Sequence, residues 1–559
     1  MSIISTAKEW LATDPHEETQ HQLRVLIEQA GKADPLALQE LHDSFSGSLQ
    51  FGTAGLRGKL GPGPNRMNVV VVARAAAGLA TYLNQQGPNK TVVIGYDARH
   101  NSKLFAQVSA QIFSGAGITT LLFPDMVPTP VLAFAIRHLG ADAGVMVTAS
   151  HNPPQDNGYK VYLGTGSQIV SPVDTEIATC ISQVAELGDV RNLPHGDTWQ
   201  LLDSTTVDAY IQHTAQLIEG EISHKSEVVT VYSAMHGVGG SYFMELAQRA
   251  GFPEPVEVVQ QFAPDPAFPT VAFPNPEEPG AMDLSIETAI AHHADLIIAN
   301  DPDADRCAVA IPTDENRKSW RMLHGDEVGA LLAMWIGSRL TDSRPPESQG
   351  VMAQSIVSCT ILEPIAHSLG FSYEQTLTGF KWIGPVPNLV YGYEEALGYC
   401  VDPQFVKDKD GLSAALKVLE LTSYLKSHNK TLQDELDRIA LEFGVYSTDQ
   451  VSIRVDALAT IDQIMLKLRI NPPTEIAGTP VREFVDLASG AGALPPTDGL
   501  MFTMANQSRV IVRPSGTEPK VKVYLQSVVE VKNHDVHSAR VQAASQLQSM
   551  ATVAREWLA

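Results

Sequence analysis

The feature that most constrains the fold is a recurring pattern of an apolar run, then a helix-like segment that ends near glycine. The runs cover Thr91–Tyr96, Val228–Tyr232 and Gly350–Val357, and the segments after them end at Gly117, Gly251 and Gly370. Glycine just past a helix favours its termination, and strand–helix–strand repeats predict parallel strands covered by helices. The pattern therefore predicts three α/β units.

The two ends of the chain depart from this pattern. Within residues 1–50, Leu23, Leu26 and Ile27 have helical spacing among charged neighbours, which predicts an amphipathic helical lead-in. Closely spaced apolar runs at 451–455, 500–504, 508–512 and 521–525 precede a helical segment at 537–558. Such an order predicts a small α+β domain, which we expect to begin near residue 446. A chain of 559 residues is in any case too long for one hydrophobic core.

Composition excludes several classes of partner. The formal net charge of −24 argues against nucleic acid and against an anionic membrane, since either requires a basic face. No apolar run reaches membrane-spanning length, and no secretory signal is visible at the start of the sequence. Four scattered cysteines form no Cys-x-x-Cys pair, which is typical of a reducing compartment. We therefore expect a cytoplasmic protein that is a monomer or dimer.

The stretch Thr148-Ala-Ser-His-Asn-Pro153 places a serine between an apolar run and a Pro-rich turn. An exposed serine at a strand end, with His151 beside it and Lys160 nearby, is a candidate nucleophile with candidate acid/base groups. Strands that end in serine before a proline turn are also common for structural reasons, and a surface lysine is usually salt-bridged. The interpretation of this serine as a nucleophile therefore depends on the other motifs in the chain.

A second stretch, Asn300-Asp-Pro-Asp-Ala-Asp-Arg306, follows an apolar strand-like run. In an extended segment alternate residues share a face, so Asp301, Asp303 and Asp305 are expected to project together. Carboxylates so close repel one another unless a cation neutralises them, and Mg²⁺ prefers oxygen ligands. An EF-hand is excluded because Arg306 and Pro312 occupy the positions that need Gly and Glu. A solvent-exposed acidic turn is the remaining alternative to a metal site.

A third stretch, Arg513-Pro-Ser-Gly-Thr-Glu-Pro-Lys520, lies between two predicted strands. Hydroxyls, cations and a glycine turn that exposes backbone N–H groups suit a phosphate. An ordinary turn with a surface arginine is the alternative. Phe51-Gly-Thr-Ala-Gly-Leu-Arg-Gly58 likewise brings three glycines to one arginine, which lets backbone and guanidinium approach an anion. A plain glycine-rich loop is equally compatible with that pattern.

Three further stretches supply polar groups. Tyr391-Gly-Tyr-Glu-Glu-Ala396 carries two adjacent carboxylates, which accept hydrogen bonds from sugar hydroxyls but also suit the first turn of a solvated helix. Thr376–Lys381 and Asp408–Gly411 add hydroxyl and ammonium groups and are not distinctive alone.

In this order, the stretches resemble the α-D-phosphohexomutase superfamily over nearly the whole chain after residue 50. The Ser150 and Asp301 stretches are the most specific. Gly52–Gly58 with Gly61–Asn68 is most similar to the branch that contains phosphoglucomutase-2-like, phosphopentomutase and glucose-1,6-bisphosphate synthase proteins. The resemblance implies three similar α/β domains with mixed sheets plus a C-terminal α+β domain, around a central cleft. The expected domains are 1–205 for phosphoserine, 206–322 for metal, 323–445 for sugar and 446–559 for phosphate.

The resemblance also implies a role for each stretch. Ser150 is expected to carry the transferred phosphoryl group, with His151, Lys160 and Arg57 as its catalytic companions. Ser150, Asp301, Asp303 and Asp305 are expected to hold one Mg²⁺. The expected substrate-binding residues are Thr53, Arg306, Thr378, Lys381, Glu394, Glu395, Lys409, Arg513, Ser515, Gly516, Thr517 and Lys520.

The activity implied is a phosphosugar mutase that moves a phosphoryl group between the 1- and 6-positions of a hexose phosphate, with glucose as the leading sugar. Glucose 1,6-bisphosphate would be its intermediate and activator. Hexose-specific relatives usually have Gly-Glu-Glu-Ser where this chain has Tyr393 and Ala396, so mannose, pentose phosphates or a bisphosphate-synthase activity stay open. An aspartyl-phosphate-type phosphatase and a non-catalytic sugar-phosphate-binding regulator are the competing classes.

Overall fold

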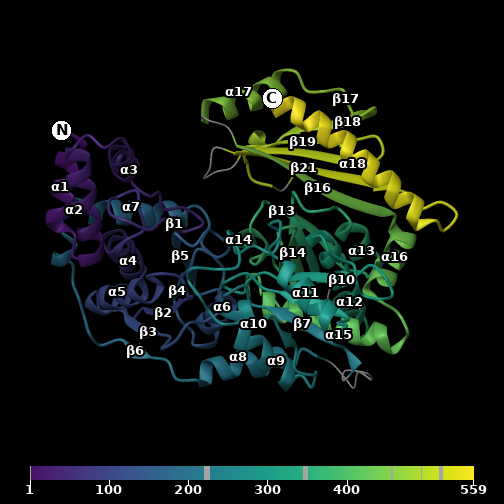
Figure 1. Cartoon of the computed structure of the whole chain (residues 1–559), viewed down its shortest axis with the longest axis horizontal. Helices are drawn as coiled ribbons and strands as arrows, with labels where there is room; N and C mark the ends of the chain where they lie inside the picture. The colour runs from purple at the N-terminus through teal and green to yellow at the C-terminus, as the bar shows by residue number, and fades with distance from the viewer. Residues whose placement is uncertain are drawn as a thin grey trace. The chain divides into compact units, whose positions relative to one another are not determined.

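A computed structural model describes residues 2–218, 227–343, 350–454, 458–492, 494–514 and 520–558. The chain forms two compact units. Unit 1 comprises residues 1–322 and 398–424, and unit 2 comprises residues 323–397 and 425–559. The chain therefore enters unit 2, returns to unit 1 for a short segment, and then completes unit 2 (Figure 1).

Unit 1 contains a six-stranded mixed sheet in the order β1-β5-β4-β2-β3-β6. Its strands are β1 (Leu56–Lys59), β2 (Thr91–Tyr96), β3 (Thr119–Leu122), β4 (Ala143–Val147), β5 (Asp156–Leu163) and β6 (Gln200–Leu201). Its helices are α4 (Val69–Gln85), α5 (Ser102–Gly115), α6 (Thr129–His138), α7 (Val173–Glu186) and α8 (Thr205–Ala215). β2, β3, β4 and β6 are parallel, whereas β5 and β1 add antiparallel edges. Every residue of β4 is buried, as expected of a parallel strand covered on both faces.

The N-terminal lead-in is confirmed as helical, but it is divided into three helices. These are α1 (Ile3–Thr13), α2 (Glu17–Gly31) and α3 (Pro35–Phe45). Ala7, Leu23 and Leu41 are fully buried in a small core of their own. Asp34 caps α3 by accepting hydrogen bonds from two backbone N–H groups of its first turn, which separates α3 from α2.

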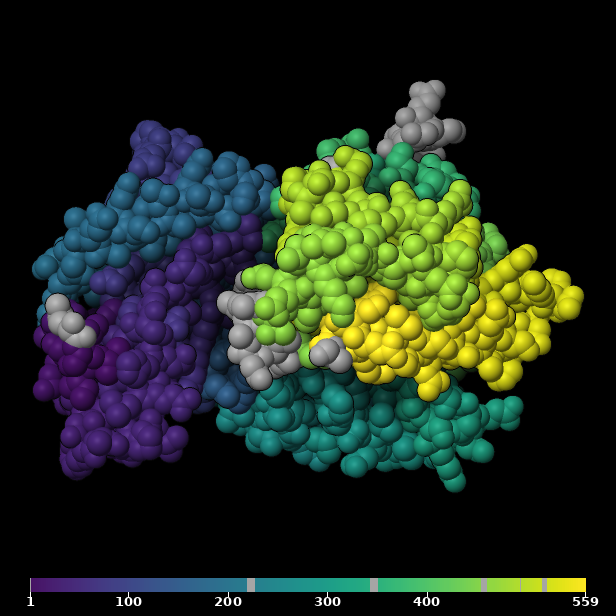
Figure 2. Space-filling model, turned by 90° about the horizontal axis from the view of Figure 1, so that it is seen from above, coloured from purple at the N-terminus to yellow at the C-terminus, as the bar shows by residue number. Residues whose placement is uncertain are grey.

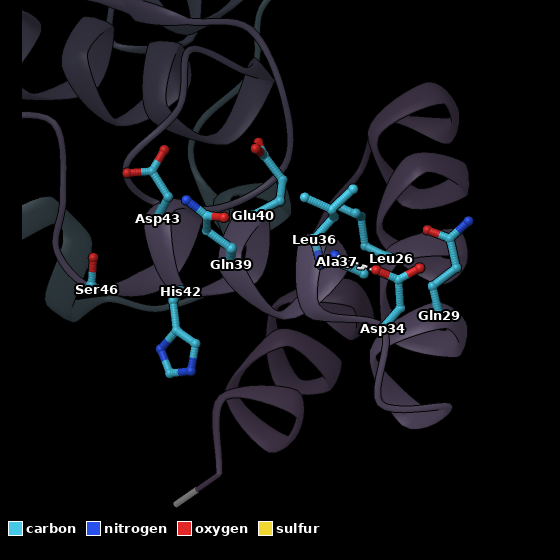
Figure 3. Close-up of a pocket in the computed structure, with 10 residues that line it drawn as sticks. All are labelled: Leu26, Gln29, Asp34, Leu36, Ala37, Gln39, Glu40, His42, Asp43 and Ser46. Atoms are coloured by element: carbon cyan, nitrogen blue, oxygen red, sulfur yellow. Dashed lines mark hydrogen bonds between the residues drawn. The ribbon is translucent and has the colours of Figure 1, made fainter.

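A hollow lies over α2 and α3, and Figure 3 shows Glu40 and Asp43 projecting from α3 to one side and His42 to the other. Both carboxylates form ion pairs with Arg66, whose side chain is almost completely buried. Arg66 lies just before α4, so these ion pairs tie the N-terminal helices to the first sheet. The two carboxylates that line the hollow therefore help to pack the N-terminal helices against the rest of unit 1.

Unit 1 also contains a five-stranded mixed sheet in the order β11-β10-β9-β7-β8. Its strands are β7 (Thr230–Ser233), β8 (Val256–Glu257), β9 (Leu296–Ala299), β10 (Ala308–Pro312) and β11 (Trp320–Met322). Its helices are α9 (Gly239–Arg249), α10 (Val259–Phe262) and α11 (Asp283–Ala291). The returning segment of unit 1 contains β15 (Gly398–Cys400), which is not a strand of this five-stranded sheet, and most of α15 (Gly411–Ser427).

Unit 2 begins with a parallel sheet in which β12 lies between β13 and β14. Its strands are β12 (Val351–Ser355), β13 (Ser372–Thr376) and β14 (Leu389–Glu394). Its helices are α12 (Gly325–Ser343), α13 (Leu362–Ser368), α14 (Phe380–Ile383) and α16 (Leu432–Phe443). β12 and α13 match the third predicted strand and helix.

The rest of unit 2 is an antiparallel sheet in the order β16-β21-β20-β19-β18-β17. Its elements are β16 (Val445–Arg454), α17 (Leu458–Ile470), β17 (Glu475–Ile476), β18 (Thr479–Asp486), β19 (Leu500–Met504), β20 (Arg509–Pro514), β21 (Lys520–Val529) and α18 (Val536–Leu558). α17 and α18 share one core with the sheet, and Figures 1 and 2 show the yellow α18 beside the yellow-green segment before it. The C-terminal α+β prediction is therefore confirmed.

The expected architecture of three α/β parts and a C-terminal α+β part is confirmed. The repeated strand–helix pattern alone predicted parallel sheets, whereas the two sheets of unit 1 carry antiparallel edges. The antiparallel strands are β1, β5, β10 and β11, and hydrophobic periodicity does not indicate the direction of a strand. Within the described ranges, no helix is long and apolar enough to cross a membrane.

The C-terminal core depends on Phe502, which is fully buried between the rings of Phe484 and Trp557 at centroid distances of 5.0 and 5.8 Å. We expect Phe502→Ala to lower the free energy of unfolding of unit 2 by about 3–5 kcal/mol, because it removes a large apolar side chain and leaves a cavity. Urea unfolding followed by tryptophan fluorescence measures this loss. Leu466→Ala is the control, since Leu466 is 55% exposed and its change should cost about 0.5 kcal/mol or less.

Candidate functional site

Ser150 lies just beyond the carboxyl end of β4, where an α/β sheet usually presents its ligand-binding groups. Its Oγ donates a hydrogen bond to Asp301 Oδ2 at 2.7 Å and lies 3.3 Å from His151 Nδ1. The sequence predicted an exposed serine, but Ser150 is only 2% exposed. Its φ of 50° is in the left-handed region, which costs a non-glycine residue free energy unless its surroundings hold it.

Arg99 holds this backbone. Its guanidinium donates to the carbonyls of Ser150 at 2.6 Å and Asn152 at 2.5 Å through Nη2. Through Nη1 it donates to the carbonyls of Pro153 at 2.8 Å and Asp156 at 3.1 Å. Arg99 is almost completely buried. One rigid fork of donors therefore fixes the whole turn that carries Ser150.

Asp97, which follows β2 directly, supports both Arg99 and the turn. Its Oδ2 accepts a hydrogen bond from Thr148 Oγ1 at 2.6 Å and lies 3.5 Å from Arg99 Nε. Thr148 Oγ1 in turn accepts the backbone N–H of Ser150 at 2.9 Å. Because β2 and β4 are adjacent parallel strands, Asp97 and Thr148 meet at the same edge of the sheet.

The glycine-rich stretch approaches Ser150 through β1. Arg57 Nη1 donates to Asn152 Oδ1 at 3.1 Å, while Thr53 lies in the preceding turn. The close approach of β1, β4 and β5 requires glycine at position 158, where a Cβ atom would lie 2.6 Å from the Thr148 carbonyl oxygen and 2.9 Å from that of Leu56.

The three aspartates follow β9 and are completely buried. They lie in a turn and not in an extended segment, and Ala304 within it has φ 54°. The prediction that alternation places them on one face is therefore wrong in its geometry. Their proximity is nevertheless real, since one carboxylate oxygen from each lies within 4.8 Å of the others.

The contacts of the aspartates fit a metal ion. Asp303 Oδ2 accepts hydrogen bonds from Thr129 Oγ1 and Lys160 Nζ, both at 2.7 Å, and Asp305 Oδ2 accepts from Lys160 Nζ at 2.8 Å. Asp303 Oδ1 and Asp305 Oδ1 are buried and have no hydrogen-bond partner among the described residues. Buried carboxylate oxygens without partners are costly, and a cation bound by the three aspartates would satisfy them. The triad is thus able to bind a metal.

Two predicted substrate-binding cations also lie at this triad. Arg306 Nε is 3.9 Å from Asp301 Oδ2, and Lys409 Nζ, from the returning segment, is 3.4 Å from Asp305 Oδ2. Burial would raise the pKa of Asp305, but Lys160, Lys409 and Arg306 outweigh it and lower that pKa. The opposite balance holds at Asp301, whose pKa is raised by burial and by the two neighbouring carboxylates.

Lys160 and His151 are held in different protonation states. Burial would lower the pKa of Lys160, but the carboxylates of Asp303, Asp305 and Asp408 outweigh it and raise the pKa. Removal from water, with Arg306, Arg57 and Lys409 adding repulsion, lowers the pKa of His151 well below its usual value. At neutral pH these shifts favour a protonated Lys160 and a neutral His151.

The other predicted residues lie in unit 2. Thr378 follows β13, Lys381 is in α14, Glu394 ends β14, and Glu395 follows it. Arg513 is in β20 and Lys520 begins β21, so the stretch does connect two strands, while Ser515, Gly516 and Thr517 lie outside the described residues. Thr378 Oγ1 is buried, and no residue in the described ranges forms a hydrogen bond with it. Burial, Glu394 and Asp326 raise the pKa of Glu395 to about 7, although Ser358 and Ser355 donate hydrogen bonds to it.

Sequence reasoning missed several supporting residues. Arg99, Thr129, Ser355 and Ser358 each contact a predicted site residue or its backbone, and Asp97 supports Arg99 and Thr148 behind them. Asp97 and Arg99 could have been suspected, because they follow the strand Thr91–Tyr96 directly. Thr129 carried no such signal, since its partner Asp303 is 174 residues away.

Family models match four parts of this chain. They describe phosphoglucomutase/phosphomannomutase alpha/beta/alpha domain I at residues 48–187, domain II at 208–314, domain III at 324–441, and the C-terminal domain at 480–542. Together these ranges cover well over half of the chain. The chain belongs to the phosphoglucomutase/phosphomannomutase family.

Relatives within this family carry different names. A Haemophilus influenzae protein named "Probable phosphomannomutase" is 49% identical over 82% of this chain and 92% of its own length. The Homo sapiens phosphopentomutase is 35% identical over 94% of this chain and 92% of its own. A Staphylococcus aureus phosphoglucomutase is 35% identical over 87% of this chain and 91% of its own. The names agree on mutase chemistry and differ in the sugar.

Solved structures agree on the fold. A phosphoglucomutase/phosphomannomutase family protein from Burkholderia thailandensis has a TM-score of 0.67 at 19% identity, over 88% of this chain and 96% of its own. The open form of pp63/parafusin from Paramecium has a TM-score of 0.68 at 18% identity, over 90% of this chain and 95% of its own. As a phosphomutase-family member, the chain is an intramolecular phosphotransferase.

The Arg99 contacts generate a prediction. We expect Arg99→Lys to lower kcat/KM about 100-fold or more, because an ammonium cannot reproduce a planar fork that binds four carbonyls. Mutase turnover measures the loss, and circular dichroism checks that the fold is retained. Arg74→Lys is the matched control, since its guanidinium donates to one carbonyl, that of Gly188, far from Ser150 in the sequence. Equal activity of the two variants would contradict the role given to Arg99.

Proposed function

We propose that this mutase moves a phosphoryl group between the 1- and 6-positions of a hexose phosphate, with glucose 1-phosphate as its preferred substrate and phosphorylated Ser150 as its carrier. The observation that carries the proposal is the 2.7 Å hydrogen bond from Ser150 Oγ to Asp301, in a triad that still has two buried carboxylate oxygens without partners. A hydroxyl beside a cation-binding triad suits phosphoryl transfer, which requires positioning and charge neutralisation above all.

Asp301, Asp303 and Asp305, with an oxygen of the Ser150 phosphate, would hold one Mg²⁺. When bound, the ion neutralises charge that develops on the transferred phosphoryl group. The cations around the triad act on the same group. Arg57 stands beside the turn through Asn152, and Arg306 and Lys409 face the aspartates. These side chains orient the phosphoryl group and offset part of its charge.

The protonation states of His151 and Lys160 determine which group accepts a proton during transfer and which one supplies it. As the bond between the Ser150 Oγ and phosphorus breaks, a new phosphorus–oxygen bond forms to a free sugar hydroxyl, whose proton passes to neutral His151. Lys160, held protonated by Asp303 and Asp305, would supply the proton that Ser150 Oγ gains. The bisphosphate intermediate, glucose 1,6-bisphosphate, then turns and its other phosphate returns to Ser150, which regenerates the carrier. Free bisphosphate activates the enzyme by phosphorylating Ser150.

We assign sugar and distal-phosphate recognition to unit 2. The carboxylates of Glu394 and Glu395 would accept hydrogen bonds from sugar hydroxyls, with Thr378 and Lys381 supporting them. Arg513 and Lys520, with the turn at 515–517, would bind the phosphate that does not react, while Thr53 would bind substrate from unit 1. The four ranges matched by family models support a division into phosphoserine, metal, sugar and phosphate domains near residues 205, 322 and 445.

A second candidate is a phosphopentomutase. Ala396 places a methyl group where a hydroxyl would favour a hexose, and the human relative named phosphopentomutase aligns with 94% of this chain. A smaller sugar needs fewer hydroxyl contacts, so the loss at Ala396 would cost it less.

Removal of one metal ligand gives a prediction. We expect Asp303→Asn to weaken Mg²⁺ binding at least about 10-fold, because the amide removes a negative charge from the buried triad. Isothermal titration with MgCl₂ measures the affinity directly. Asp142→Asn is the matched control, since Asp142 pairs with Lys90 at the other end of β4. Unchanged Mg²⁺ affinity in Asp303→Asn would contradict the metal site.

The function is tested by turnover and mass together. We expect the protein to gain one phosphate when mixed with glucose 1,6-bisphosphate, and Ser150→Ala to gain none and to lose mutase turnover more than about 1,000-fold. Intact-mass spectrometry and a coupled assay on glucose, mannose, ribose and deoxyribose 1-phosphates measure both. Ser109→Ala, a buried serine of α5 bonded to Phe105, is the control.

The outcomes separate the competing classes. Faster turnover of ribose 1-phosphate than of glucose 1-phosphate would favour the pentose candidate. Steady phosphate release that survives Ser150→Ala would instead indicate a phosphatase of the aspartyl-phosphate type. Binding without interconversion of any sugar would indicate a regulator.

A further inference from the structure

The connection from β12 to α13, Ser355–Thr360, joins the predicted sugar loop to the antiparallel sheet within unit 2. We call it the β12–α13 loop. Ser355 and Ser358 are both fully buried, as is the side chain of Gln354 just before them. Two buried hydroxyls are not required for a strand-to-helix connection, so their partners show what they do.

On one side the β12–α13 loop forms hydrogen bonds with Glu395. Ser355 Oγ and Ser358 Oγ each donate to Glu395 Oε2 at 2.9 Å. The Glu395 backbone N–H donates back to Ser358 Oγ at 3.0 Å, and the backbone N–H of Ser358 donates to Ser355 Oγ at 3.2 Å. Both hydroxyls therefore accept from backbone and donate to the carboxylate. Both hydroxyl contacts to the carboxylate fall on the same oxygen, Oε2.

On the other side the loop is anchored to the antiparallel sheet. Ile356 and Val357 pack with Leu487, Ile511 and Tyr524 in one buried cluster. This is the face of the sheet opposite to α17 and α18, since Ile511 alternates with Val510 and Val512 of the helix-covered core.

Polar contacts fix the same anchor. Arg509 Nη2, from β20, donates to the Ser358 carbonyl at 2.6 Å. Gln526, from β21, accepts the backbone N–H of Thr360 at 2.9 Å and donates to Thr360 Oγ1 at 2.7 Å. The buried Asp326 accepts the backbone N–H of Cys359 at 2.7 Å. These contacts hold the backbone of the β12–α13 loop in place. The two serine hydroxyls therefore have fixed positions, and they restrain the Glu395 side chain.

We propose that Ser355 and Ser358 are positioning residues for sugar recognition, which act by fixing the Glu395 carboxylate so that it selects among the hydroxyl patterns of aldose phosphates. The inference rests on the proposed sugar-binding role of Glu395. The residue after Glu395 is Ala396, which has no hydroxyl, so the hydroxyls beside this carboxylate come from the β12–α13 loop instead. The two hydrogen bonds also restrict the motion of the Glu395 carboxylate. A rigid acceptor discriminates between hydroxyl positions better than a mobile one.

The test compares Ser355→Ala, Ser358→Ala and the double variant on glucose 1-phosphate and ribose 1-phosphate. Each single variant should raise KM for the preferred sugar about 3- to 10-fold and the double variant about 10- to 100-fold, with kcat changed less. The ratio of kcat/KM between the two sugars should move toward unity in each. If the double variant does not fold, the single variants decide.

Ser527→Ala is the matched control. Ser527 is fully buried in β21 of the same unit, and its hydroxyl donates to Gln546 and not to Glu395. A purely structural role for the loop serines would lower activity on both sugars equally, as a general loss of folded protein does. An unchanged ratio in Ser355→Ala and Ser358→Ala would therefore overturn the inference.

Glu395→Gln separates this inference from the function on which it rests. If Glu395→Gln shifts the sugar ratio and the serine variants do not, the positioning role fails while the sugar-binding role of Glu395 stands. If Glu395→Gln itself keeps the wild-type ratio, the sugar-binding role fails and the inference fails with it. A shift in both sets supports both.

Discussion

The burial of three carboxylates in one turn is the constraint on which unit 1 depends. Asp301, Asp303 and Asp305 are removed from water entirely, and their repulsion would be prohibitive without compensating charge. Lys160 comes from β5, Arg306 from the end of the aspartate turn itself and Lys409 from the returning segment. One charge cluster therefore ties together parts of the chain that are far apart in sequence. Because two carboxylate oxygens still lack partners, the protein alone does not complete the compensation.

The backbone of the turn that carries Ser150 is held in place mainly by the side chain of Arg99. Arg99 binds four carbonyls of the turn, and Asp97 holds Arg99 and, through Thr148, the N–H of Ser150. The sequence stretch around Ser150 therefore identifies only part of the site, because residues outside that stretch hold the serine in place. A comparable arrangement holds Glu395 through the β12–α13 loop in unit 2.

The sequence predicted the elements whose signal is local. The apolar runs Thr91–Tyr96 and Leu500–Met504 coincide with strands, because a buried strand leaves a continuous or alternating apolar pattern. It also predicted that the aspartates cluster, although a turn and not an extended segment brings them together. It did not predict that Ser150 is buried or that Lys160 is held protonated, since both depend on residues more than fifty positions away. Long-range partners of this kind leave no periodicity to read.

The division of the chain between the units bears on its biosynthesis. Unit 1 is not complete when residue 322 leaves the ribosome, because β15, Lys409 and most of α15 are still to come. Asp305 is translated roughly a hundred residues before the Lys409 ammonium that neutralises it, which at about 5–20 residues per second is a delay of several seconds. During that interval the nascent acidic turn has only its earlier cations, Lys160 and Arg306. The order of translation thus completes this charge cluster only after the first part of unit 2, residues 323–397, has been synthesised.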